Sequence, residues 1–117
     1  MTAYAIAHLL SGEQHPEVAE YIERVQGTMK PFGGRFLVHN AQHETVEGVW
    51  NGDVVMIGFP DMEAARAWYA SDAYREILPL RTDHLGGNVI LVPGVPEGYD
   101  AAPAAAKLRA ALAAESS

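Results

Sequence analysis

The sequence predicts an α+β fold, and three observations support this prediction. Short apolar runs that end at glycine or proline are typical of buried strands. Two segments between these runs repeat apolar residues at the spacing of one helical face. An Asn-Gly pair at residues 51–52 is the strongest short-range signal for an antiparallel hairpin. The order strand, helix, two strands, helix, strand predicts a ferredoxin-like domain with an antiparallel sheet and both helices on one face.

The first part of the chain predicts a strand and a helix. Tyr4–Leu10 is an apolar run closed by Ser-Gly, and His8 is its only strongly polar member. Pro16 suits the first turn of a helix, which we expect to continue to about Met29, before a glycine pair stops it.

The middle of the chain predicts a strand followed by a hairpin. We expect Arg35–His39 to be extended and the polar residues 40–42 to form a turn or bulge before a second extended segment at 43–50. The pair at 51–52 then joins that segment to the apolar run Asp53–Phe59 as antiparallel neighbours.

The second helical region begins after Asp61, whose side chain is a suitable cap. Ser-Asp at 71–72 caps a continuation that ends near Arg81, and residues 88–92 form the last strand. We therefore assign residues 1–95 to the ferredoxin-like domain. Residues 96–117 are a linker and an alanine-rich C-terminal helix or tail.

Composition excludes several classes of partner and site. The chain has 117 residues, no cysteine and a formal net charge of −7, so no basic face exists for nucleic acid or an anionic membrane. No segment reaches the roughly 18 apolar residues of a membrane span, and the N-terminus lacks a secretory pattern. We expect a cytoplasmic protein with no nucleic-acid or membrane partner.

The predicted strands are apolar on both faces. Ile6 and Leu10 alternate with Ala5 and Leu9, and the same holds for residues 54–57. Two helices cover one face of a sheet only, so a second copy of the chain is the expected cover for the other face. The predicted partner is therefore the chain itself, in a homodimer.

Three stretches of the chain, 33–38, 46–50 and above all 59–74, resemble the domain of unknown function 1330 family. The last stretch, with its spaced Trp-Tyr, Ser and Tyr and with Leu-Arg at 80–81, is the most specific. The resemblance covers roughly residues 3–95 and implies a dimeric α/β-barrel in which two sheets face each other. Related barrels include cofactor-independent monooxygenases, cyclases, isomerases and haem-degrading enzymes.

The sequence departs from the pattern of that family at three positions. His15 stands where an acidic residue often precedes the proline of the first helix, and Gly58 stands where the family often has glutamate. His39 replaces the arginine that commonly follows the Phe-Leu-Val strand.

His8, Arg35 and Tyr69 are the candidate catalytic residues. His8 is a titratable group in an apolar strand, with a hydrogen-bonded core or interface histidine as the alternative. Period-two alternation predicts that Arg35, Leu37 and His39 share one face, where Arg35 and His39 would hold an anionic or enolic substrate. The alternative for Arg35 is a surface ion pair of little energetic consequence.

The candidate substrate-binding residues lie mostly in the second helical region. Its aromatic side chains either line a pocket or belong to the core, and polar groups at its end would orient a ligand. The set is His39, Trp68, Tyr74, Arg81 and His84.

We expect no metal and no cofactor. His39, His43 and Glu47 are four residues apart, which in an extended strand separates them by more than ~13 Å. Haem held by one histidine is a weaker hypothesis.

Two functions remain open on the sequence. The first is a homodimeric, cofactor-independent small-molecule enzyme of isomerase, cyclase or monooxygenase type, with a pocket between sheet and helices for an apolar or aromatic metabolite. The alternative is a non-catalytic dimer that binds a small metabolite or serves as an interaction module.

Overall fold

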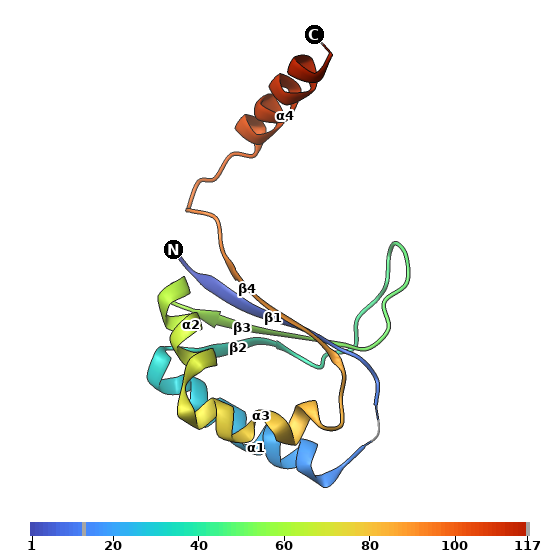
Figure 1. The fold of residues 1–117 in the computed structure, drawn as a ribbon, viewed down its shortest axis with the longest axis vertical. Helices are drawn as coiled ribbons and strands as arrows, with labels where there is room; N and C mark the ends of the chain where they lie inside the picture. Colours follow the sequence, from blue (N-terminus) through green and yellow to red (C-terminus); the bar gives the residue numbers. More distant parts are fainter. Residues whose placement is uncertain (13, 117) are drawn as a thin grey trace.

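The computed structural model describes residues 1–12 and 14–116 and confirms the ferredoxin-like order of elements (Figure 1). A single 3₁₀ turn, Lys30–Phe32, follows the first helix. The strands and helices are β1 (Ala3–Leu9), α1 (Pro16–Met29), β2 (Arg35–His39), β3 (Asp53–Phe59), α2 (Met62–Ala70), α3 (Asp72–Thr82), β4 (Gly87–Pro93) and α4 (Ala102–Glu115).

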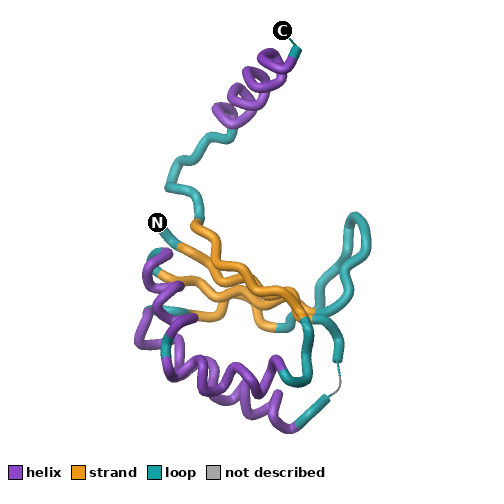
Figure 2. Tube along the Cα trace, viewed as in Figure 1, coloured by secondary structure: helices purple, strands orange, loops and turns teal. Residues whose placement is uncertain are grey.

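The four strands form one antiparallel sheet in the order β2-β3-β1-β4. Helices α1, α2 and α3 lie together on one face of this sheet, and no described helix covers the other (Figures 1 and 2). We call the helix-covered side the inner face and the opposite side the outer face. The split β-α-β prediction is therefore confirmed, with its second helix divided into α2 and α3.

The predicted hairpin at residues 51–52 is wrong. Residues 43–50 form an irregular loop that leaves the sheet, and β3 pairs with β2 and β1 instead. Gly52 has a φ of 110°, and a Cβ at this position would overlap the carbonyl oxygen of Leu9. The glycine is thus required for close approach to β1 rather than for a two-residue turn.

The predicted alternation along β2 is also wrong, because the strand contains a β-bulge. Phe36 pairs with Ile57 and Val38 pairs with Met56, so Leu37 is an extra residue with no partner of its own. One extra residue moves the side chains that follow it to the opposite face of the sheet. Arg35 therefore stays on the outer face, whereas His39 moves to the inner face and stacks on Phe36 at 4.5 Å between ring centroids.

Side-chain caps define the boundary between α2 and α3. Asp61 begins α2 by accepting a hydrogen bond from the Ala64 amide at 2.8 Å. The Ser71 hydroxyl donates to the Trp68 carbonyl at 2.7 Å and accepts from the Tyr74 amide at 3.3 Å. Ser71 thus ends one helix and begins the next, as the sequence predicts.

The core lies between the inner face and the helices. Its aromatic centre is Trp68, whose indole N–H donates to Thr28 Oγ1 at 3.0 Å. The buried apolar side chains are Ala3, Ala5, Val25, Met29, Ile57, Phe59, Ala65, Trp68, Tyr74 and Ile77.

The alanine-rich segment forms α4, which projects from the sheet and is exposed along its length (Figure 1). Within residues 1–12 and 14–116, no helix is long and apolar enough to cross a membrane. The division of the chain at residue 95 stays a prediction.

Candidate functional site

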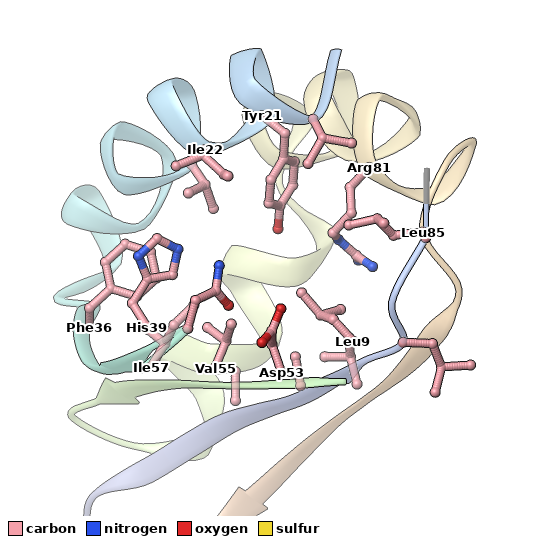
Figure 3. Close-up of a pocket in the computed structure, with 18 of the residues that line it drawn as sticks. Leu9, Tyr21, Ile22, Phe36, His39, Asp53, Val55, Ile57, Arg81 and Leu85 are labelled. Carbon is pink, nitrogen blue, oxygen red and sulfur yellow. The ribbon is translucent and has the colours of Figure 1, made fainter. Parts of the chain in front are cut away.

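A pocket of about 300 Å³ opens between the inner face and helices α1 and α3 (Figure 3). Its walls are mostly apolar, with Ala5, Ala7 and Leu9 from β1 facing Val18 and Ile22 from α1. The alanines of β1 are the reason that space remains, because a larger side chain at either position would fill it. Such a pocket suits a small apolar ligand.

Arg81 is the cation of this pocket. It lies in the last turn of α3 with only 6% of its surface exposed, and its guanidinium carbon lies 5.4 Å from the ring centroid of Tyr21. Among the described residues no carboxylate lies within ion-pair distance of it. A buried cation without an acidic partner is poised to receive a negatively charged ligand atom.

Two tyrosines complete the polar end of the pocket. The hydroxyls of Tyr21 and Tyr74 are hydrogen-bonded at 2.9 Å. Burial, followed by the proximity of Tyr74, raises the pKa of Tyr21 well above its ordinary value, so this phenol keeps its proton. Although burial alone would lower it, the hydrogen bond to Tyr74 and the proximity of Tyr21 leave the pKa of Arg81 raised, so the guanidinium keeps its charge.

The sheet contributes an acid and a histidine opposite these groups. Asp53, the first residue of β3, and His39, at the end of β2, both line the pocket. In Figure 3 the Asp53 carboxylate points into the cavity from the sheet, while the Arg81 guanidinium and the Tyr21 hydroxyl point into it from the helices. A ligand between the two layers would meet a cation on one side and a proton acceptor on the other.

The pocket brings together four of the predicted site residues: His39, Trp68, Tyr74 and Arg81. Trp68 contributes the face of its indole only, because its N–H is already bonded to Thr28. His39 reaches the pocket through the bulge in β2 rather than through alternation with Arg35.

The other predicted site residues lie outside the pocket. His8 is on the outer face, where its Nε2–H donates to the Asn51 carbonyl and its ring lies 4.5 Å from that of Trp50. Arg35 is exposed on the same face. Tyr69 packs against Tyr74 from outside the pocket, and the Arg75 guanidinium lies 5.9 Å from its ring.

His84 also lies outside the lining, just beyond the end of α3. Its Nε2 is 2.7 Å from Glu17 Oε1, and its ring stacks on that of His15 at 3.7 Å between centroids. This hydrogen bond, more than any other influence, lowers the pKa of Glu17.

Sequence reasoning missed Tyr21 and Asp53. Tyr21 is four residues before Val25 and shares its helical face, so the spacing contained the signal. Asp53 is a carboxylate at the start of an otherwise apolar strand, and this pattern marks a polar group at the end of a buried strand.

Comparison with solved structures supports the fold. A protein of unknown function from Rhodopseudomonas palustris is 16% identical, with a TM-score of 0.62 over 81% of this chain and 83% of that chain. SnoaB, a cofactor-independent oxygenase from Streptomyces nogalater, is 14% identical, with a TM-score of 0.59 over 85% of this chain and 98% of that chain. The de novo designed protein Foldit4 is 18% identical, with a TM-score of 0.50 over 80% of this chain and 98% of that chain.

These likenesses show the fold alone, because the same arrangement occurs in an oxygenase and in a designed protein. No curated protein matches the sequence. A family model does match, over residues 2–95, which confirms the resemblance noted above. The chain therefore belongs to the family described as Domain of unknown function (DUF1330).

Proposed function

We propose that this protein is a homodimeric small-molecule enzyme that binds a planar, apolar compound with an ionisable or enolisable oxygen and moves a proton on it without a cofactor. The observation that carries the proposal is Arg81, a buried cation with no acidic partner in the described chain, set in the wall of an apolar pocket. Isomerases and cofactor-independent oxygenases both begin with deprotonation of such a compound.

The first step follows from the groups on the two sides of the pocket. The Asp53 carboxylate takes a proton from a carbon beside the substrate carbonyl, and the electron pair moves onto the carbonyl oxygen. Arg81 stabilises the negative charge that develops there, and the Tyr21 hydroxyl donates a hydrogen bond to the same oxygen. Return of the proton to another carbon completes an isomerisation. In an oxygenase, dioxygen would instead act as the oxidant and form a bond to the enolate carbon, which gives a peroxide of the substrate.

The neighbouring structures are consistent with this proposal. SnoaB is described as a cofactor-independent oxygenase, and it shares the fold over 85% of this chain. At a sequence identity of 14%, the catalytic residues of SnoaB cannot be transferred to this chain. The proposed reaction therefore depends on the residues that line the pocket.

The apolar outer face of the sheet supports the proposed homodimer. Ile6 of β1 pairs with Met56 on one side and with Ile90 on the other, so three apolar side chains lie in a row across the middle of the sheet. Ile90 is 55% exposed and Leu37 is 42% exposed. A sheet-on-sheet contact with a second copy would bury this surface and give the dimeric barrel that the family resemblance implies.

The proposal is tested with two probes. Binding of 2-naphthoate, a planar anion, is measured by isothermal titration calorimetry, and exchange of the α-hydrogens of α-tetralone in D₂O is followed by proton NMR. Arg81→Met keeps an unbranched, flexible side chain and removes the guanidinium charge, so naphthoate affinity should fall by roughly tenfold to a hundredfold. Asp53→Asn should slow the exchange by roughly a hundredfold or more, and naphthoate should still bind.

The matched control is Arg35→Met, an arginine on the outer face, which should change neither readout. Thermal melts of each variant show whether it is folded. Equal naphthoate affinity in folded Arg81→Met and in the unchanged protein would refute the anion site. Tight binding without any exchange of α-tetralone would favour the non-catalytic metabolite-binding dimer.

A further inference from the structure

Three metal-ligating side chains converge at one end of the pocket, outside its lining. His15 immediately precedes α1, Glu17 is in the first turn of that helix, and His84 follows α3. One ligand atom from each residue lies within 4.8 Å of the other two, and all three side chains are partly buried. The chain thus brings two imidazoles and a carboxylate together from segments 67 residues apart.

We propose that His15, Glu17 and His84 bind a divalent transition-metal ion, with zinc as the best match. Two imidazole nitrogens and one carboxylate oxygen are a common set of protein ligands for zinc and its neighbours in the first transition row. Such a set leaves at least one coordination position open to water or to a ligand. The proposal is independent of the proposed enzyme function, because its test requires no substrate.

The distances between the possible ligand atoms are close to those expected around a bound zinc ion. Ligand atoms around a tetrahedral zinc lie roughly 3.4 Å apart, given bonds of about 2.1 Å. Here Glu17 Oε1 is 2.7 Å from His84 Nε2 and 3.9 Å from His15 Nδ1, so one separation widens and the other shortens. These shifts are within the reach of partly exposed side chains.

The protonation of His15 favours metal binding through Nδ1. This nitrogen accepts a hydrogen bond from the Glu17 amide at 3.1 Å, so it carries a lone pair and not a proton. A metal at Nδ1 would replace that hydrogen bond.

The two histidine rings are stacked on each other, and both lie beside Glu17. The rings lie 3.7 Å apart at an interplanar angle of 12°. Because an imidazole nitrogen binds a metal in the plane of its ring, metal binding would turn one of the two rings out of this stack. A structural ion pair with Glu17 would need only one of the two histidines.

The position of the site indicates its effect on the pocket. Gln14, Val18 and Leu85, which are sequence neighbours of the three ligands, line the pocket. A bound metal would fasten the start of α1 to the segment after α3, and so hold one end of the pocket in place. We therefore expect zinc to raise the melting temperature of the protein.

The test is calorimetric titration of the tag-free, chelator-treated protein with zinc chloride. One zinc ion should bind per chain, and the melting temperature should rise with it. His15→Asn removes the imidazole but keeps a side chain that caps the helix well, and His84→Gln removes the second imidazole. Each variant should bind zinc at least about tenfold more weakly and lose most of the rise in melting temperature.

His43→Asn is the matched control, since His43 is an exposed histidine on the loop between β2 and β3. It should bind zinc like the unchanged protein. Cobalt substitution adds a spectroscopic readout, because visible absorption bands of bound Co²⁺ should disappear in His84→Gln. Zinc affinity that falls equally in all three variants, or binding only at millimolar zinc, would overturn the proposal.

Discussion

The two faces of the sheet differ in the size of the side chains that β1 places on them. Ala3, Ala5 and Ala7 point to the inner face, whereas Tyr4 and Ile6 point to the outer face. The inner face is covered by three helices and still leaves a pocket, whereas no described helix covers the outer face (Figure 1). One strand therefore places small side chains beside an open pocket and larger apolar side chains on the face that no described helix covers.

This difference shows that an apolar strand can contribute to two different features of a protein. On the inner face, small side chains leave volume that the packed helices do not fill, and this volume can hold a small molecule. On the outer face, large side chains leave apolar surface, which a second sheet can cover without a gap. The outer face predicts a dimer contact and the inner face predicts a ligand site. Substitutions of neighbouring residues in β1 test the two predictions separately.

The largest effect is expected on the outer face, from Ile6→Lys. A lysine in the middle of an apolar sheet-to-sheet contact would bury an unpaired charge, so the dimer dissociation constant should rise by about a hundredfold or more. Sedimentation equilibrium would measure it, and Ala7→Leu serves as the matched change on the inner face. A variant that stays dimeric at micromolar concentration would show that the outer face is not the interface.

A smaller effect is expected on the inner face, from Ala7→Leu. The added carbons occupy the pocket, so naphthoate affinity should fall by about tenfold, while the dimer is retained. Overpacking costs about 1–3 kcal/mol of stability, which a denaturant titration would report. Unchanged affinity in a folded variant would place the ligand elsewhere than beside β1.

The smallest effect concerns the alkaline limit of stability. The folded state raises the pKa of Tyr21, so its contribution to stability is fully present below pH 10 and is lost as the pH rises, because the unfolded chain releases the proton first. At pH 10.5 the loss is about 1 kcal/mol. Tyr21→Phe should flatten this decline between pH 9 and 10.5 in thermal melts. An equal decline in the variant and the unchanged protein would contradict the burial of this phenol.

Much of the fold could be predicted from the sequence because its signals are local. The cap at Asp61, the break at Ser71 and the helical spacing of α1 all act within a few residues, and each prediction is confirmed. The hairpin at 51–52 failed because Gly52 serves a contact with Leu9, more than 40 residues away, that turn statistics do not register. The aromatic residues Trp68 and Tyr74 were found because helical spacing in α2 and α3 predicts the side of each helix on which they lie.

The candidate site was predicted only in part, because it depends on which side chains of each strand face the helices. The bulge at Leu37 reverses the alternation in β2, so Arg35 and His39 fall on opposite faces although the sequence separates them by an even number. His8 falls on the outer face because Ala5 and Ala7 take the inner one, and nothing local to His8 decides which set faces the helices. The cluster of His15, Glu17 and His84 depends on how the ends of α1 and α3 meet, which spacing along the chain does not reveal.

Ser71 has a consequence for the evolution of the pocket. Its hydroxyl donates to the carbonyl of Trp68 and accepts from the amide of Tyr74, so one side chain outside the pocket lining sets the angle between two helices that contribute lining residues. A substitution there would turn α3 relative to α2 and reshape the aromatic wall while every lining residue kept its identity. The shape of the pocket can thus change through a substitution at this helix junction, and comparison of the lining residues alone would not detect the change.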